Sequence, residues 1–486
     1  MPKRAYNRRS FLKNVGMGAA AMALPGCVNL RRPAASKIGK RPNFVVVLCD
    51  DLGYGDLGCF GHPTIRTPHL DKLAARGVRL TDCYSAAPVC SPARVGMHTG
   101  RIPVRAGVCS WISSGPEHMR ASEITIATLL RNAGYDTCHV GKWHCNRDLT
   151  DATLPQPGDH GFSHWFSTQD DAYPWHYRPE NFVRNGQEVG RLEGYSCRIV
   201  VDEAIDWLGK GRDRDNPFFL HVCFHEPHEP IASPAEMVGK YGQVSNKDEA
   251  LYYANVSNMD RAFGKLMAAL EAQGLADNTL VFFTSDNGPE TLNRYPGAQR
   301  SYGSPGPLRG MKLHIYEGGI RVPGILYWPG YSRPGSICKQ PISGVDVLPT
   351  FCEMAQVEAP SDRAIDGASF LPVLSGRNIK RRTPLFWHYY RAIGRAKVAM
   401  RQGDWKIVAH WDHPTVLQPG AVLHPGDIEM IKQANLVNLE LYRLSSDIGE
   451  TTDLASSHPD RLASLAQEMV QLNAEVVKDA PVWDFS

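Results

Sequence analysis

The chain has 486 residues, of which 43% are hydrophobic and 21% are charged, a composition typical of folded globular proteins. This excludes an intrinsically disordered protein and leaves room for one large domain with a smaller one beside it. Residues 1–41 carry ten basic and no acidic groups, so the formal charge of +3 becomes −7 from residue 42 onward, with 43 basic and 50 acidic groups. An overall basic surface for binding nucleic acid is therefore excluded.

The first 26 residues are predicted to be an export signal. Residues 7–13 read Asn-Arg-Arg-Ser-Phe-Leu-Lys and resemble the twin-arginine motif, and the mildly apolar run over 15–24 is too short to span a bilayer. Residues 24–27, Leu-Pro-Gly-Cys, resemble a bacterial lipobox, which implies a lipid anchor at Cys27 followed by a tether over 27–41. We therefore expect the twin-arginine machinery to export the protein to the bacterial periplasm, free or as a membrane-anchored lipoprotein.

The segment 42–376 is predicted to form a doubly wound, mostly parallel α/β sheet with flanking helices. Its first strand, 43–49, is a continuous apolar run that ends in two aspartates, as a central strand buried on both faces does. Strands and helices then alternate over more than 300 residues, as such a sheet requires. The further strands are predicted over 137–140, 218–224, 280–284 and 324–327, and the helices over 68–76, 124–133, 198–208, 249–273 and 347–355.

The segment 377–486 is predicted to form a smaller antiparallel sheet covered by one helix. Its short β-like pieces lie at 385–390, 397–401, 405–410 and 440–444, and the helix at 459–477. Three stretches with weak periodicity are predicted to be loops that shape the mouth of a pocket, at 145–195, 289–308 and 411–435.

Two pairs of oxygen-bearing side chains follow predicted strands. Asp50 and Asp51 end the first strand, and Asp286 and Asn287 follow the strand 280–284. Three carboxylates and an amide suit a hard cation such as Ca²⁺, whereas zinc is disfavoured because the set lacks a thiolate and is poor in imidazole. The alternative for each pair is a turn or a helix cap.

The twelve cysteines do not by their even number predict disulfides, and no Cys-x-x-Cys pair indicates zinc. Cys49 and Cys223 lie in apolar strands and are predicted to be small buried side chains. Cys90 begins the sequence Cys-Ser-Pro-Ala-Arg. Taken alone, it could be a buried thiol, a disulfide partner, or a nucleophile with a histidine as its base.

Residues 90–94, with the continuation Val-Gly-Met-His-Thr-Gly-Arg to Arg101, resemble the extended signature of the formylglycine-dependent sulfatase family. The resemblance implies an alkaline phosphatase-like fold and oxidation of Cys90 to formylglycine by a formylglycine-generating enzyme. It also implies a Ca²⁺ ion held by Asp50, Asp51, the side chain at position 90, Asp286 and Asn287, since residues 50–53 and 285–288 match the family's metal-binding segments.

The same resemblance assigns the donors around the sulfate. Arg94 and His144 are expected to be catalytic, as is His228, and Lys142 and Lys312 to bind the sulfate. For His225, a sugar contact and a role in capping the strand both stay open. Segments near 309–323 and toward the end of the chain also resemble family members, and Glu317 and Arg321 are expected to be structural.

The mechanism implied by the resemblance begins with a formylglycine hydrate, stabilised by the cation and Arg94, that attacks the sulfur of a sulfate ester. His228 then protonates the leaving oxygen, and His144 takes a proton from the second hydroxyl so that sulfate is expelled. Lys142 and Lys312 hold the charge that redistributes.

The substrate is expected to be a sulfated saccharide, with an aryl sulfate as a second possibility. Aromatic residues could stack on a sugar or pack on their own domain, namely Trp165, Phe166, Tyr173, Trp175, His176 and Tyr177. Alternative functions are a formylglycine phosphodiesterase or phosphonate monoester hydrolase, and a non-catalytic lipoprotein that binds sulfated glycan. Two lysines around one metal favour sulfate over a dianionic phosphate.

Overall fold

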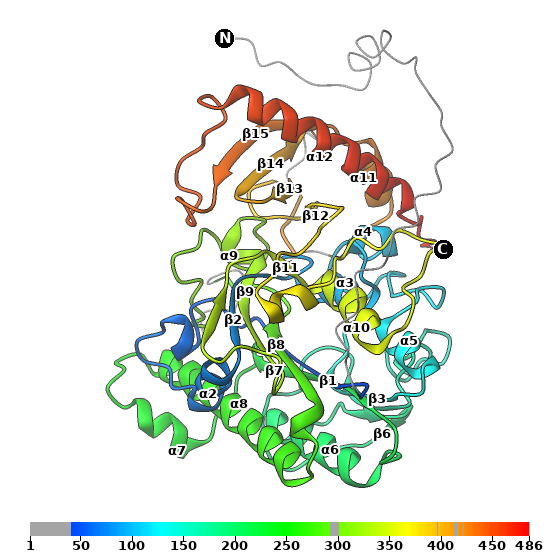
Figure 1. Cartoon of the computed structure of the whole chain (residues 1–486), viewed down its shortest axis with the longest axis vertical. Helices are drawn as coiled ribbons and strands as arrows, with labels where there is room; N and C mark the ends of the chain where they lie inside the picture. Colours follow the sequence, from blue (N-terminus) through cyan, green and yellow to red (C-terminus); the bar gives the residue numbers. More distant parts are fainter. Residues whose placement is uncertain (1–39, 292–300, 396, 413–416, 421, 486) are drawn as a thin grey trace.

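The computed structural model describes residues 40–291, 301–395, 397–412, 417–420 and 422–485. Within these residues the chain forms an eleven-stranded sheet and a separate four-stranded sheet. The four-stranded sheet lies at one end of the molecule and the large sheet with its helices fills the rest (Figure 1). The export motif and Cys27 lie outside the described residues, as does part of the predicted loop 289–308.

The large sheet is mostly parallel. Its strand order is β10-β2-β9-β8-β1-β7-β3-β4-β5-β6, with β11 paired to β2. The central strands β8, β1, β7, β3 and β4 run parallel to one another, whereas β9 runs antiparallel to both β2 and β8 and β5 runs antiparallel to β4. The strands are β1 (Asn43–Asp50), β2 (Val78–Tyr84), β3 (Asp136–Lys142), β4 (His164–Thr168), β5 (Val183–Arg184), β6 (Gln187–Glu188), β7 (Phe218–Pro227), β8 (Thr279–Ser285), β9 (Arg321–Tyr327), β10 (Ser336–Cys338) and β11 (Ile342–Ser343).

Helices cover both faces of this sheet because alternate side chains of its strands point to opposite sides. Phe44 and Val46 of β1 pack with α3 (Cys90–Thr99), α5 (Ile126–Asn132) and α10 (Val347–Ala355). Val45 and Val47 pack with α2 (Pro68–Arg76), α6 (Ser196–Lys210) and α8 (Lys247–Ala272). The shorter helices are α4 (Pro103–Ala106), α7 (Ala235–Val238) and α9 (Glu317–Ile320). The doubly wound fold predicted from the sequence is therefore confirmed.

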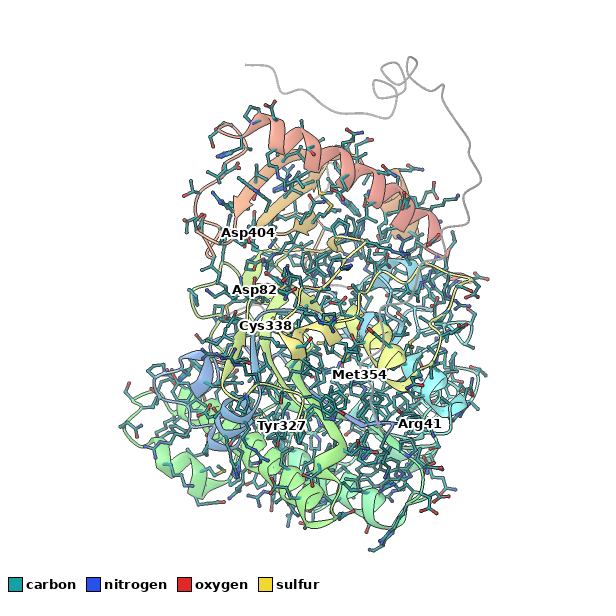
Figure 2. All side chains as sticks on the ribbon, viewed as in Figure 1. Arg41, Asp82, Tyr327, Cys338, Met354 and Asp404 are labelled. Atoms are coloured by element: carbon teal, nitrogen blue, oxygen red, sulfur yellow. The ribbon has the colours of Figure 1, made fainter. Side chains whose placement is uncertain are left out.

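The smaller sheet is antiparallel, with the order β12-β13-β14-β15. Its elements are β12 (Leu385–Tyr389), β13 (Lys397–Gln402), β14 (Trp405–Trp411), α11 (Asp427–Gln433), β15 (Leu436–Arg443) and α12 (Pro459–Asp479). Buried charges join it to the large sheet. Asp82 of β2 lies where the two sheets approach each other (Figure 2), and it accepts hydrogen bonds from Arg321 at 2.6 Å and from Arg401 of β13 at 2.7 Å.

Several elements differ from the predicted ones. The segment 145–195 contains β4 and the short strands β5 and β6, and 411–435 contains α11, so these stretches are not wholly loops. Strand β2 was not predicted because polar residues interrupt its apolar pattern, and the strand is stabilised by pairing with β9, β10 and β11, which come much later in the chain. Among the described residues, no helix is long and apolar enough to cross a membrane.

Candidate active site and metal centre

Five neighbouring parallel strands deliver several of the predicted site residues, together with Asp170 and Asp171, to one edge of the large sheet. The carboxyl ends of parallel strands meet at the same edge, where α/β sheets place their chemistry. Strand β8 leads into Asp286 and Asn287, β1 ends at Asp50, β7 leads into His228, β3 ends at Lys142, and β4 leads into Asp170 and Asp171.

A buried cluster of carboxylates lies at the centre of this edge. One ligand atom from each of Asp50, Asp51, Cys90 and Asp286 lies within 4.8 Å of the others. Asp51 has a φ of 61°, a left-handed conformation that aspartate tolerates better than most residues. Asn287 donates to Asp51 Oδ1 at 2.6 Å, so both predicted pairs of ligands form one cluster.

These residues fit a hard cation. The Oδ1 atom of Asn287 is buried and has no hydrogen-bond partner among the described residues, so it is available as a ligand. Burial, and after it the charge of the neighbouring Asp50, raises the pKa of the Asp286 carboxyl to about 7. Carboxylate and amide oxygens without a thiolate ligand are the donors that Ca²⁺ takes.

Cys90 begins helix α3, and every residue of this helix is buried. Its Sγ atom lies 3.3 Å from Asp50 Oδ1. Burial, with the charge of Asp50, raises the pKa of the Cys90 thiol well above its ordinary value, and a thiol in that state is a poor nucleophile. The eleven cysteines in the described part of the chain form no disulfide, so two of the three open interpretations of Cys90 find no support here.

Arg94 lies one turn after Cys90 on α3 and is buried beside the cluster. Its Nε and Nη2 atoms donate to Asp286 Oδ2 at 3.0 and 2.7 Å, and Nη1 donates to the carbonyl oxygen of Lys142 at 2.7 Å. Arg94 thereby connects the helix that carries position 90 to the ends of β8 and β3.

Lys142 and His144 lie on one side of the cluster. The Nζ atom of Lys142 is 2.7 Å from Asp50 Oδ2. His144 has a φ of 53°, and its Nε2 atom is 2.9 Å from the carbonyl oxygen of Ile112. That contact places the ring proton on Nε2 and leaves the lone pair on Nδ1. Burial lowers the pKa of His144 to about 3, so the imidazole is neutral and able to accept a proton.

Lys312 and His228 lie on the other side. The Nζ atom of Lys312 is 2.7 Å from Asp51 Oδ2, and His228 Nε2 is 3.5 Å from the same oxygen. Burial opposes protonation of His228, but the carboxylates around it, with Asp171 first, raise its pKa to about 9. His228 therefore carries a proton at neutral pH.

Asp170 and Asp171 are part of this constellation, and the sequence reasoning missed them. Asp170 Oδ1 is 2.7 Å from Lys142 Nζ and 3.3 Å from His144 Nδ1, and Asp171 Oδ2 is 3.3 Å from His228 Nδ1. The signal that could have revealed them was their position just after residues 164–168, His-Trp-Phe-Ser-Thr, which have the length and composition of a strand.

His225 lies inside β7 and is fully buried, with its Nε2 atom 2.7 Å from Thr168 Oγ1. Its role in binding a sugar stays a prediction. The aromatic residues of the segment 165–177 differ in how far they are buried. Trp165, Phe166 and His176 are buried, whereas Tyr173 and Trp175 expose 67% and 52% of their surface; Tyr177 is half-buried, with its ring 4.9 Å from that of Tyr195.

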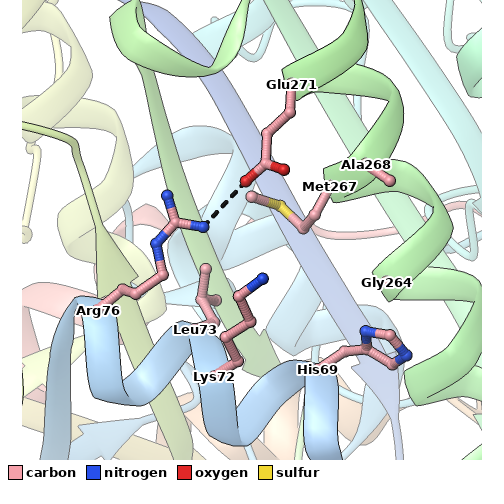
Figure 3. A pocket seen from close by; sticks show the side chains of 8 residues that line it. All are labelled: His69, Lys72, Leu73, Arg76, Gly264, Met267, Ala268 and Glu271. Atoms are coloured by element: carbon pink, nitrogen blue, oxygen red, sulfur yellow. Dashed lines mark hydrogen bonds and ion pairs between the residues drawn. The ribbon is translucent and has the colours of Figure 1, made fainter.

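A surface hollow elsewhere on the molecule lies between α2 and α8. Arg76 reaches across it to Glu271 at 2.9 Å (Figure 3). Its lining consists of His69, Lys72, Leu73, Arg76, Gly264, Met267, Ala268 and Glu271, and it includes none of the predicted site residues.

Comparison with known proteins agrees with this arrangement. The Sulfatase family profile matches residues 42–357, and the profile described as N-sulphoglucosamine sulphohydrolase, C-terminal, matches residues 311–418. The chain is 33% identical to human arylsulfatase A over 94% of this chain and 93% of that protein. It is 32% identical to human N-acetylgalactosamine-6-sulfatase over 92% of this chain and 88% of that protein.

Among solved structures, Ps i-CgsB in complex with k-i-k-neocarrahexaose has a TM-score of 0.76 at 26% identity, over 92% of this chain and 95% of that chain. The family match covers more than half of this chain, and both human relatives match nearly all of it. The chain belongs to the sulfatase family and is a sulfuric ester hydrolase.

Proposed function

We propose that the protein hydrolyses a sulfate monoester on a sulfated saccharide, using formylglycine made from Cys90 and a Ca²⁺ ion. The observation that carries this proposal is the cluster of Cys90 with Asp50, Asp51 and Asp286, whose ligand atoms lie within 4.8 Å of one another. A second support is that two lysines and two histidines surround this cluster.

The saccharide is supported by relatives and by the site's mouth. One relative is named N-acetylgalactosamine-6-sulfatase, and a structural neighbour was solved with a hexaose. In this chain, Tyr173 and Trp175 are exposed on the segment after Asp171 and offer flat apolar faces of the kind on which sugar rings stack.

Position 90 and the cation would together supply the reactive group: a formylglycine hydrate offers one hydroxyl to attack sulfur and another to release sulfate, and Ca²⁺ lowers the cost of the negative charge. The chain's own residues do the rest. Arg94 keeps α3 fixed against Asp286, while Lys142 and Lys312 exchange carboxylate partners for the oxygens of the sulfate.

In this proposal, His228 and His144 carry out the proton transfers. His228 is protonated, and its Nδ1 atom lies 2.5 Å from the carbonyl oxygen of Glu229, so its Nε2 atom, 3.5 Å from Asp51 Oδ2, is the one that would donate to the leaving alcohol oxygen. His144 is neutral with its lone pair on Nδ1, so it accepts the proton whose removal releases sulfate from position 90.

The test is mass analysis of the peptide that contains position 90, from protein produced together with a formylglycine-generating enzyme, alongside assays of sulfate release. We expect Cys90 converted to formylglycine, sulfate released from an aryl sulfate and from members of a sulfated-sugar panel, and no release by C90A. The control is C59A, which removes a half-buried thiol outside the site. Its rate of sulfate release should equal that of the enzyme without substitutions.

Two results would overturn the proposal. An unmodified thiol with no sulfate release from any substrate would favour a binding protein. Faster cleavage of a phosphodiester or a phosphonate monoester than of every sulfate ester would favour the related hydrolases.

The metal is tested by elemental analysis of purified protein after dialysis against a chelator and reloading with Ca²⁺. One Ca²⁺ per chain is expected, lost in D286N and retained in D362N, an exposed carboxylate that pairs with Arg363 at the surface. Binding of Ca²⁺ that is unchanged in D286N would place the metal elsewhere.

We also propose that the chain is exported and anchored by lipid at Cys27. The support is the paired Arg8 and Arg9, followed by the short apolar run and Cys27. Fractionation of bacteria producing the full chain should find it in the envelope, with R8K/R9K trapped in the cytoplasm and R4K exported as before. C27A should release the protein from the membrane without preventing export, and an envelope location unaffected by R8K/R9K would contradict the signal.

A further inference from the structure

Three histidines and a cysteine gather in the core behind the active site, and the reaction uses none of them. His139 of β3 pairs in register with His221 of β7, so the two side chains are neighbours on one face of the sheet. Cys223 lies two residues further along β7 and points to the same face. His98 of α3, one turn after Arg94, packs against the same place.

The donor atoms of this cluster are close together. One ligand atom each from His139, His221 and Cys223 lies within 4.8 Å of the other two, and Cys223 Sγ is 3.4 Å from His221 Nε2. The ring of His98 lies 5.0 Å from that of His221 and 6.4 Å from that of His139, measured between ring centroids.

Several nitrogens of these rings lack the partners that buried polar atoms need. His139 Nε2, His221 Nδ1 and His98 Nδ1 are buried and have no hydrogen-bond partner among the described residues. His139 Nδ1 lies 2.8 Å from Ser167 Oγ, which orients the ring and leaves Nε2 directed away from Ser167. A buried donor or acceptor without a partner destabilises the fold, so a metal ion that takes His139 Nε2 would remove one such penalty.

The walls of the cluster are apolar. The rings of Trp143 and Phe162 pack against His139 at 5.1 and 5.3 Å between centroids, and all of these side chains are buried. Burial lowers the pKa of His98, His139 and His221 well below the ordinary value, so the imidazoles are neutral. Neutral imidazoles have lone pairs to offer to a metal ion.

We propose that His139, His221 and Cys223 form a second metal site, distinct from the carboxylate cluster, that binds Cu(I). Two imidazoles and a thiolate, with no carboxylate, are soft donors that select Cu(I) or Zn(II) over Ca²⁺. Charge decides between these two. Cu(I) with one thiolate is neutral, whereas Zn(II) would leave a net positive charge among the buried rings of Trp143 and Phe162.

Binding requires only the loss of one proton. The copper–sulfur bond replaces the S–H bond of Cys223, the proton passes to solvent, and the imidazole nitrogens donate their lone pairs without any change in the oxidation state of copper. Because binding releases the Cys223 proton, the affinity should increase with pH.

The experiment uses the full chain in its calcium-loaded form, produced with and without copper and handled without oxygen. Copper(I) is titrated against a colorimetric Cu(I) chelator, and X-ray absorption at the copper edge reports the donor atoms. We expect one tightly held Cu(I) per chain with two nitrogen donors and one sulfur donor, and a rise in the temperature of unfolding.

The variants separate this site from other thiols and from the calcium site. C223S and H139Q should lose at least tenfold in Cu(I) affinity. Cys138 lies on β3 beside His139, but its side chain packs in the core on the opposite face of the sheet. C138S should therefore bind Cu(I) as tightly as the chain without substitutions does, and so should C59S. D51N should lose Ca²⁺ but keep the copper.

Copper with sulfur-only coordination, copper binding that survives in C223S, or Zn(II) held at these residues in place of Cu(I) would each overturn the proposal. X-ray absorption on the unsubstituted protein keeps the proposal testable if a core variant does not fold. None of these outcomes depends on sulfate release, so the second site and the proposed function can fail separately.

Discussion

At the scale of single residues, the site depends on buried charges that hold one another. Arg94 satisfies Asp286 through two hydrogen bonds and also reaches the backbone of Lys142, so one side chain fixes three elements. Arginine can do this because its guanidinium is planar and carries several donors, whereas a lysine offers one compact ammonium group.

We therefore expect R94K to lower kcat/KM for sulfate-ester hydrolysis by at least about 100-fold, the order of effect seen when an active-site charge donor is lost. The variant should remain folded, because one positive charge still faces Asp286. Steady-state kinetics with circular dichroism provide the measurement. R363K, at an exposed pair, is the control, and equal activity of R94K and R363K would contradict the assigned role.

Glu117 shows what burial does to a single carboxyl away from the site. Its side chain accepts hydrogen bonds from the backbone of Cys109 and Ser110, and burial raises its pKa to about 8. The folded protein thus holds this proton more tightly than the unfolded chain does. The free energy of unfolding should fall as pH rises from about 4.5 toward 8, by up to about 1.4 kcal/mol per pH unit.

E117Q keeps an acceptor but cannot ionise, so it should remove this part of the pH dependence. Denaturant unfolding at pH 5.5 and pH 8 checks it: relative to the unmodified protein, E117Q should gain stability at the higher pH. E429Q, at an exposed position, should change nothing. If the free energies of unfolding of E117Q and of the protein without substitutions differ by the same amount at both pH values, the raised pKa of Glu117 would be refuted.

At the scale of elements, the strand ends depend on close backbone approach. Gly141 has a φ of 97°, and a Cβ atom there would overlap the carbonyl oxygen of Cys223 on the neighbouring strand β7. Only glycine lets β3 turn at this point and present Lys142 to the carboxylate cluster.

G141A should therefore destabilise the fold by at least about 3 kcal/mol, because backbone overlap adds to the strain of a positive φ. G186A separates the two effects, since Gly186 also has a positive φ of 86° but has open space around its Cα. We expect G186A to cost about 1 kcal/mol in denaturant unfolding. Equal losses in the two variants would show that the contact with Cys223 is unimportant.

At the scale of the whole molecule, buried ion pairs join the two sheets. Lys406 of β14 lies 2.9 Å from both Glu317 and Glu450, and all three side chains are buried. Glu317 also pairs with Arg321 at the start of β9. The smaller sheet is thus attached by buried ion pairs to the segment that leads into β9 of the large sheet.

K406M should cost about 3–5 kcal/mol, because it leaves two buried carboxylates without their shared cation. K210M is the matched control: Lys210 pairs with Asp206 at 2.6 Å, but both are exposed, so its loss should cost less than about 0.5 kcal/mol. Denaturant unfolding of both variants provides the measurement, and equal effects would show that the buried pair contributes no more than a surface pair.

The sequence alone was enough to predict the order of the main strands and helices, because long apolar runs and helical periodicity depend on local spacing. It was also enough to predict the residues at the carboxylate cluster, since each follows a strand whose end must lie at one edge of the sheet. The resemblance to sulfatases came from short contiguous motifs, which can be recognised without knowledge of the fold.

Only the tertiary structure decided the features that depend on contacts between segments far apart in the sequence. Strand β2 is ordered by pairing with β9 and β10, and Asp170 and Asp171 acquire a role only because β4 lies beside β3. The cluster of His98, His139, His221 and Cys223 comes from three separate elements and no local pattern connects them. Such arrangements escape a linear reading because their energies come from pairwise contacts between residues that are far apart along the chain.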